Sequence, residues 1–276
     1  MNARALLAWS ASALVVVLST SNPVYRGVVA LCALNLILAR GAPGARLRPL
    51  FIGMGIATVL ATLVSMFLSH TGTHALFALP SDVPLLGGAV TFESAVSGLS
   101  TGLGIVAAVL AAAPLTLVSE PHELVSALPR ALARTGAAIG AALNVMPGLA
   151  RSAVEISDAQ RMRGWRARRV RDWPDVAVPV VLTAVEGSLA LAEAMEARGY
   201  GAGARTHYTV QRWTRWDVVI VIASTIAAAA FAVLRILGVA GDWYPYPVVA
   251  WPQVSVAALA CCAVFVLPSL GRARVS

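Results

Sequence analysis

The sequence contains no lysine and few cysteines, and each shortage excludes a class of function. All 21 basic residues in the 276-residue chain are arginine. The phosphate-binding loop GxxxxGK[ST] therefore cannot be present, and the chain does not hydrolyse ATP by that route. The three cysteines lie in apolar runs without metal-ligand or redox spacing: Cys32, Cys261 and Cys262. This pattern indicates neither a zinc site nor a disulfide framework, and favours small buried apolar side chains.

Charge of either sign is also scarce. Charged residues make up 12% of the chain and hydrophobic residues 58%, with a mean hydropathy of +0.77. A soluble domain carries about 25% charged residues. The composition therefore predicts an all-α, polytopic helical membrane protein.

Apolar runs near the length of a membrane span predict six transmembrane helices. They cover residues 5–20, 24–39, 50–69, 92–118, 217–239 and 248–268. The first run has the length of a signal peptide, but we expect a retained helix that forms a tight hairpin with the second. Gly98, Gly102 and Gly104 predict a close helix contact in the fourth span. Between the spans we expect an outer loop at 70–91 and an aromatic interfacial loop at 240–247.

The spans divide the chain into three segments. Residues 1–118 hold four spans, residues 119–216 form a polar region, and residues 217–276 hold two spans. With both termini in the cytoplasm, 19 of the 21 arginines fall on the inner side. This distribution follows the positive-inside rule and explains the formal charge of +8 without nucleic acid.

The polar region is predicted to be helical. A helix starts at Glu120, Pro129 and Pro147 break the following pattern, and long helices cover 148–163 and 174–198. The run 176–192 is apolar enough to resemble a span. Glu186 and Glu193 argue against insertion, because an acid near a helix centre costs about 2.5 to 3.5 kcal/mol on insertion scales. We expect this helix to be buried against other protein inside or just under the membrane.

One short pattern occurs twice in the polar region. The copies read DAQRMRGW (158–165) and EAMEARGY (193–200), 35 residues apart: an acid, Ala, three residues, Arg, Gly and an aromatic. Glycine after a run of helix formers is a common C-cap, and arginine in the last turn interacts favourably with the helix dipole. Each copy therefore predicts a helix that ends with an exposed arginine. One copy alone would be an ordinary helix end, whereas two matching copies indicate two equivalent binding points.

Other chemistry is poorly supported. His70 and His74 could share a helix face, but no third metal ligand is near. The basic segment 164–173 with two tryptophans could be a nucleic-acid patch, but a loop near anionic lipid heads is the simpler interpretation. The predicted spans hold almost no ionisable residues, which argues against an independent ion-driven carrier.

The duplicated motif and the layout resemble the transmembrane coupling subunit (T component, EcfT/CbiQ family) of energy-coupling factor transporters, prokaryotic importers of vitamins and metal ions. The second motif matches as Ala197-Arg198-Gly199, and the first departs as Met162-Arg163-Gly164. The wider spacing holds through Ala159 and Ala194. Around the motif, Met162, Trp165, Met195 and Tyr200 would supply apolar packing.

The resemblance implies a non-catalytic, multi-pass subunit of the cell membrane that needs no cofactor. Its implied partners are two ATP-binding subunits, which dock on the two motifs, and a substrate-binding membrane S component, besides the lipid bilayer. The alternative is a permease subunit of another ABC importer type, but such chains usually carry one coupling helix. A membrane enzyme lacks a clustered catalytic set here, and a channel lacks polar pore-lining residues.

Overall fold

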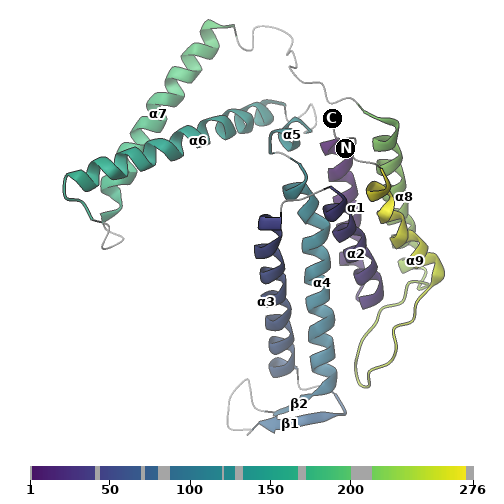
Figure 1. The fold of residues 1–276 in the computed structure, drawn as a ribbon. Coiled ribbons are helices and arrows are strands. Elements are labelled where there is room, and N and C mark those ends of the chain that lie inside the picture. Colours follow the sequence, from purple (N-terminus) through teal and green to yellow (C-terminus); the bar gives the residue numbers. More distant parts are fainter. Residues whose placement is uncertain are drawn as a thin grey trace. The chain divides into compact units, whose positions relative to one another are not determined.

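A computed structural model describes residues 2–40, 44–69, 72–79, 88–119, 121–127, 133–166, 172–199 and 213–271. The chain is an all-α polytopic membrane protein with one small strand pair (Figure 1). It divides into two compact units. The membrane unit comprises Met1–Leu124 and Arg212–Ser276, and the second unit comprises Val125–Gln211.

Most helices of the membrane unit form where the apolar runs predict them, and the last one begins later than predicted. They are α1 (Ala3–Ser19), α2 (Pro23–Ala39), α3 (Gly44–Leu68), α4 (Phe92–Leu117), α8 (Arg215–Ile236), α9 (Val256–Ala263) and α10 (Leu267–Leu270). The boundary between the two units falls within the short helix α5 (Pro121–Ser126). A 3-10 turn, η3 (Val264–Val266), links α9 to α10. Asn2 and Asn22 cap α1 and α2 by accepting a hydrogen bond from the N–H two residues on.

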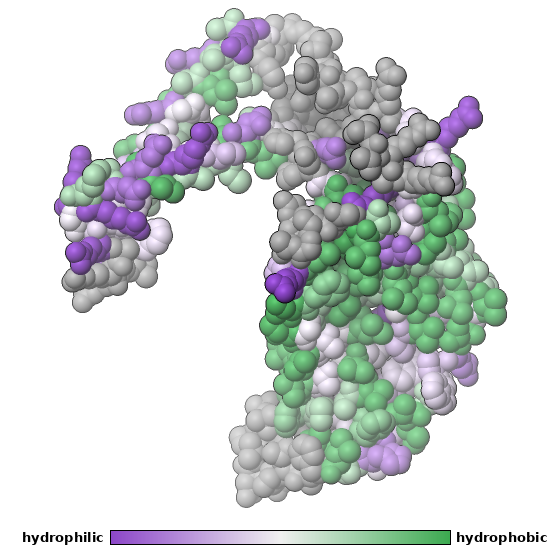
Figure 2. All heavy atoms as spheres, viewed as in Figure 1, coloured by the Kyte–Doolittle hydropathy of each residue, from purple (hydrophilic) through white to green (hydrophobic). Residues whose placement is uncertain are grey.

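The core of the membrane unit lies where α1, α2, α4, α8 and α9 meet. Aromatic rings fill it in two edge-to-face pairs, Trp9 with Phe265 and Tyr25 with Phe231, whose centroids lie 6.0 and 5.5 Å apart. The Trp9 indole donates to the Phe265 carbonyl at 3.2 Å. Hydrophobic side chains cover the helices of this unit in Figure 2, as lipid contact requires.

The cysteine prediction is confirmed in its main point. Cys32 and Cys262 are buried in this core, Cys261 is half-buried, and all three are free thiols. The expected tight pairing of the first two helices is only partly observed. The turn Thr20–Asn22 joins α1 and α2, but α1 packs mainly on α8 and α4, and α2 mainly on α4 and α9.

Three expectations about local structure are wrong. Part of the predicted outer loop forms an antiparallel strand pair, β1 (Ala75–Leu79) and β2 (Gly88–Thr91). Residues 248–255 are not helical, and the last helix begins at Val256. Prolines explain the second difference, because Pro247 and Pro252 lack the N–H that a helix needs and restrict the residue before them.

The third concerns Pro147, which was expected to interrupt the polar region. It lies inside one continuous helix, α6 (Ala133–Met162). A proline removes one hydrogen bond of the helix, and the remaining bonds of this 30-residue helix maintain it. Pro49, Pro114 and Pro179 also lie inside helices. Pro129 falls outside the described residues.

The second unit consists mainly of α6 and α7 (Pro174–Ala197), the latter as predicted from the sequence. By length and composition, α3, α4, α7 and α8 are the helices of the described chain that could cross a membrane, whereas α1, α2 and Val256–Leu270 are shorter apolar helices.

Candidate functional site: two arginine-tipped helix ends

The first copy of the motif ends α6 in a Schellman cap. Gly164 has φ +87°, the left-handed conformation that glycine adopts without strain. The Gly164 N–H donates to the Arg161 carbonyl at 3.0 Å, and the Trp165 N–H donates to the Gln160 carbonyl at 2.9 Å. These two bonds define the Schellman motif and place Arg163 at the C-cap. The predicted helix end is therefore confirmed.

The second copy ends α7 with a glycine in the same left-handed conformation and with the corresponding bond from that glycine. Gly199 has φ +69°, and its N–H donates to the Glu196 carbonyl at 2.9 Å. The Arg198 N–H donates to the Ala194 carbonyl at 3.3 Å, so Arg198 is the C-cap residue here as Arg163 is in α6. Tyr200 lies outside the described residues. We call Arg163-Gly164 and Arg198-Gly199 the two Arg-Gly tips.

Both arginine side chains of the tips are exposed. Among the described residues, neither guanidinium has a hydrogen-bond or ion-pair partner in the chain. Met162, beside the first tip, is 84% exposed, an unusual position for a large apolar side chain. Each tip thus presents unused donors, and the first adds an apolar side chain.

The other residues of the motif have structural positions. Ala159 is half-buried, and Ala194 and Ala197 are exposed on α7. Trp165, which was predicted to supply apolar packing at the tip, is half-buried, and its indole N–H donates to the Asp172 carbonyl at 2.9 Å. Small residues at the three alanine positions leave the helix surface next to each arginine uncovered.

The two tips lie at opposite ends of an antiparallel helix pair. Gln160, at the end of α6, donates its side-chain amide to the carbonyl of Asp175, in the first turn of α7, at 3.2 Å. The first tip therefore lies beside the start of α7, while the second tip is the end of α7. With 24 residues in α7 and 1.5 Å per residue, the tips are separated by about 36 Å.

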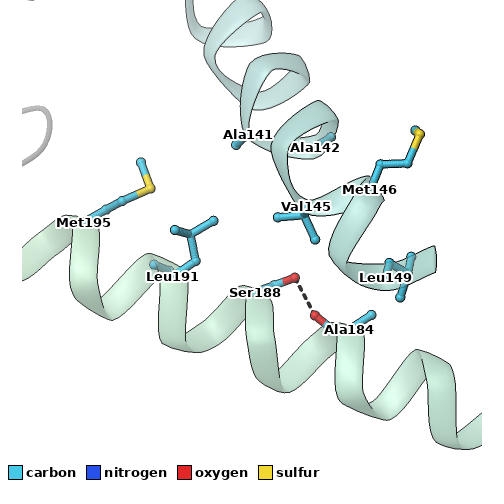
Figure 3. A pocket seen from close by; sticks show the side chains of 10 residues that line it. Ala141, Ala142, Val145, Met146, Leu149, Ala184, Ser188, Leu191 and Met195 are labelled. Carbon is cyan, nitrogen blue, oxygen red and sulfur yellow. Dashed lines mark hydrogen bonds between the residues drawn. The ribbon is translucent and has the colours of Figure 1, made fainter. Parts of the chain in front are cut away.

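An apolar groove runs between α6 and α7 where they cross, with a volume of about 580 Å³ (Figure 3). Residues of α6 line one side of the groove: Ala141, Ala142, Val145, Met146 and Leu149. Residues of α7 line the other side: Ala184, Ser188, Leu191, Ala192 and Met195. The Ser188 hydroxyl donates to the Ala184 carbonyl of its own helix at 2.7 Å, so no unsatisfied donor enters the groove. Met195 lines this groove and does not surround a tip.

The sequence did not indicate this groove, although the signal was present. Small or apolar residues recur at helical spacing in both helices, as in Ala141, Val145 and Leu149. A periodic pattern identifies a face of a helix, but it does not say which second helix completes the groove.

The outward face of α7 is also apolar and uncovered. Of its residues only Val176 is buried, and Val178, Val181, Leu182, Val185 and Leu189 are between 50% and 61% exposed. The expected burial of 176–192 against protein therefore does not occur within the described chain. It would have to come from another molecule, and the position of α7 relative to the bilayer stays a prediction.

The other sequence-based candidates give no further site. His74 is bound to Glu93, with its Nδ1 2.7 Å from the carboxylate, and His70 is outside the described residues. Within the ranges that the structure describes, no group of three His, Cys, Asp or Glu residues could hold a metal ion. The basic stretch 167–171 also lies outside those ranges.

Comparison with known proteins gives consistent matches. A family profile described as "CbiQ: Cobalt transport protein" matches residues 1–208. Three proteins named energy-coupling factor transporter transmembrane protein EcfT are similar to this chain. The Lactobacillus helveticus protein is 33% identical over 88 residues (29% of this chain, 32% of the relative), and the Staphylococcus aureus protein is 29% identical over 159 residues (51% and 59%).

The Bacillus selenitireducens protein is 25% identical over 248 residues, which cover 82% of this chain and 88% of the relative. The matched part spans less than two thirds of the length of the first two relatives. The profile match includes both motifs, because residues 1–208 contain the whole of α6 and α7.

Proposed function

Because the chain belongs to the CbiQ family of cobalt transport proteins, we propose that it is the transmembrane coupling subunit of an energy-coupling factor importer. The family and the EcfT relatives identify a membrane-embedded component of such transporters. In our proposal the chain performs no catalysis. It passes the motion of two ATP-hydrolysing subunits to a substrate-binding S component in the membrane.

The observation that supports this most is the pair of identical Arg-Gly tips. Each arginine is exposed without a partner in the described chain, and each is fixed at a helix end by a left-handed glycine. A guanidinium offers a planar fork of donors that fits carboxylates or carbonyl groups of a partner. A separation of about 36 Å gives room for two protein partners, one per tip, as two ATPase subunits would require.

The apolar surfaces of the second unit suit the other partner. The groove between α6 and α7 and the uncovered face of α7 expose Leu, Val and Met side chains without a charge. Exposed apolar surface of this extent marks interaction sites in soluble and membrane proteins alike. We propose that a membrane S component docks there. Motion of the ATPases would then rotate α6 and α7 and change the orientation of the docked component.

The proposed cargo is a vitamin or a metal ion. The family description names cobalt transport, which makes Co²⁺ one candidate. In this proposal, substrate specificity belongs to the S component. We place the protein in the plasma membrane with both termini in the cytoplasm, as the arginine distribution supports.

The test is replacement of both arginines, Arg163→Ala with Arg198→Ala, in the chain co-expressed with its ATPases. Each hydrogen bond to a charged group contributes about 1.5 to 3 kcal/mol, so each single change should weaken ATPase binding about tenfold or more. The double variant should lose co-purified ATPase and ATP-driven uptake. Arg161→Ala is the matched control, because Arg161 lies in the same turn and pairs with exposed Asp158 at 3.4 Å.

The proposal fails if the double variant retains both the ATPase and normal uptake while membrane insertion is unchanged. Identification of the proteins that co-purify from native membranes distinguishes the alternative. If the chain is a T component, the purified complex should contain one copy of this chain, two ATPase chains and a small membrane protein. A permease of another ABC importer type should bring two copies of this chain and no such membrane protein.

A further inference from the structure

The segment between α8 and α9 forms an ordered, non-helical strap, residues 241–255. Its sequence is GDWYPYPVVAWPQVS, with no charged residue after Asp242. The sequence predicts a helix from residue 248, but the chain stays non-helical to Ser255. The strap is part of the membrane unit. Polar groups near its two ends are bound at the turn between α1 and α2. Its middle is bound beyond the end of α3, where the Tyr246 hydroxyl lies 2.8 Å from the Ser69 hydroxyl and the Pro247 carbonyl accepts from the Thr73 hydroxyl at 3.3 Å.

The first end of the strap is clamped by Asp242. This carboxylate accepts a hydrogen bond from the Ser21 hydroxyl at 2.7 Å and is paired with Arg235, in the last turn of α8. Trp243 follows, with its N–H on the Ser21 oxygen at 3.1 Å and its indole N–H on the Ala250 carbonyl at 2.7 Å. Burial alone raises the pKa of Asp242, but the bonds from Arg235 and Ser21 outweigh it and lower the pKa below its usual range.

The second end is clamped by α2. The Asn22 side-chain amide donates to the Gln253 carbonyl at 2.9 Å, and the Ser255 N–H donates to the Tyr25 hydroxyl at 2.8 Å. Asn22 and Tyr25 are both fully buried. Together the two clamps fix the strap over the turn that joins α1 to α2.

The opposite side of the strap is apolar and aromatic and has no cover in the described chain. Trp251 is 93% exposed and Tyr244 is 69% exposed, and the exposed valines are Val248, Val249 and Val254. A tryptophan that is held in place and exposed to this degree is unusual in a folded protein. The strap therefore presents two large aromatic side chains from a backbone that the polar contacts hold fixed.

This face continues directly into surface that must contact lipid. At one end it meets the exposed residues of the spanning helix α8, namely Val233 and Ile236, and Leu237 after it. At the other end it meets Val256, 82% exposed, at the start of α9. A surface continuous with lipid-facing side chains on both sides is itself expected to contact lipid.

The lengths of the helices set the depth of the strap. Helices α1 and α2 have 17 residues each, or about 26 Å, slightly less than the roughly 30 Å of the hydrocarbon core. The strap covers the turn between them at the edge of that core. Non-helical backbone exposed to lipid is not stable inside the hydrocarbon, whereas tryptophan and tyrosine favour the headgroup level.

We propose that the strap lies in the lipid headgroup region of one leaflet, with Trp251 and Tyr244 as its anchors and the clamps to Ser21, Asn22 and Tyr25 holding it there. The partner is the bilayer surface itself. This fixed, lipid-bound element would hold the α1–α2 turn at constant depth while the second unit moves. The inference depends on membrane insertion of the chain and not on its ATPase partners.

Fluorescence quenching by brominated lipid tests the proposal on the full chain in phosphatidylcholine bilayers. Bromine is placed either next to the headgroup or near the end of the acyl chain. The emission of Trp251 is obtained by subtracting the spectrum of the Trp251→Phe variant from that of the unchanged protein. Bromine next to the headgroup should quench this emission most. Trp243→Phe is the control, because the Trp243 side chain is buried, at 8% exposure, and its removal should leave that quenched component in place.

A second variant adds a probe without removing one. Tyr244→Trp should increase the component that headgroup-level bromine quenches. The proposal is overturned if neither bromolipid quenches the Trp251 emission. A water-soluble quencher then shows whether Trp251 is exposed to water, if it quenches the emission, or covered by protein, if it does not. A stronger effect of bromine at the acyl-chain end would overturn it as well.

Discussion

At the scale of single residues, the chain relies on two glycines to end its coupling helices. Gly164 and Gly199 have φ values of +87° and +69°, and a Cβ at either position meets no atom within 4 Å. Space therefore does not restrict these positions, but backbone conformation does. A left-handed conformation costs a residue with a side chain about 1 to 2 kcal/mol. The direction of each arginine depends on that conformation.

Gly199→Ala should therefore destabilise the end of α7 by about 1 to 2 kcal/mol and weaken ATPase binding at the second tip. Gly187→Ala is the matched control within the same helix, where a Cβ also meets nothing within 4 Å. There alanine should stabilise by about 0.5 to 1 kcal/mol, because glycine is a poor residue in a helix interior. Thermal unfolding of the purified chain measures both. If both variants changed the stability in the same direction, the role of the left-handed cap would be contradicted.

At the scale of elements, a close helix contact joins α3 and α4 through glycines. A Cβ on Gly98 would lie 2.6 Å from the Thr62 Cα, and one on Gly102 would lie 2.6 Å from the Thr58 Cγ2. The small-residue face predicted for the fourth span is thus confirmed at these two positions. Gly104 instead faces Arg26 of α2, whose Nη1 would be 2.7 Å from an added Cβ and donates to the Ser100 carbonyl at 3.2 Å.

Gly98→Ala should lower the free energy of unfolding by about 1 to 3 kcal/mol, since α3 has to move away from α4 to admit the methyl group. The neighbour is backbone and cannot rotate aside. Gly53→Ala in α3, where a Cβ meets nothing within 4 Å, should cost nothing or stabilise slightly. Thermal unfolding in one detergent measures the pair. Gly104→Ala should fall between them, because the guanidinium end of Arg26 can shift.

At the scale of the whole molecule, one carboxylate joins the first and the later spans. Asp217 forms a capping box with Thr214 at the start of α8, with Oδ2 accepting from the Thr214 hydroxyl at 2.7 Å. Its Oδ1 accepts from the Asn2 N–H at 3.0 Å, 215 residues away. Asp217 is 3% exposed. The side chain thus holds the N-terminal ends of α1 and α8 together, where the chain returns from the second unit.

Asp217→Ala should lower stability by about 3 to 5 kcal/mol, because it leaves the buried Asn2 N–H and the part-buried Thr214 N–H and hydroxyl without their acceptor. Asp158→Ala is the control, since its pair with Arg161 is exposed on both sides and such pairs contribute about 0 to 1 kcal/mol. Unfolding measurements compare the two, and hydrogen exchange should show faster opening of the first turn of α1 in the Asp217 variant only. Similar small losses in both variants would mean that Asp217 caps α8 alone.

The sequence by itself determined the features that depend on neighbouring residues. Apolar runs located the helices of the membrane unit, because burial in lipid requires them at that length. The pattern of helix formers, arginine and glycine located both tips, because a helix C-cap involves about six consecutive residues. The glycine spacing in α4 located a contact face, though not the helix that fills it.

Only the tertiary structure decided which distant residues meet. It placed the tips at opposite ends of an antiparallel pair, formed the groove between α6 and α7, and bound Asp217 to Asn2. It also replaced the first turns of the predicted last helix by the strap, whose contacts to Ser21, Asn22 and Tyr25 span more than 200 residues of sequence. The physical reason is the same in each case. Hydrogen bonds and packing between remote segments depend on how the chain returns to itself, and no local pattern of residue types carries that information.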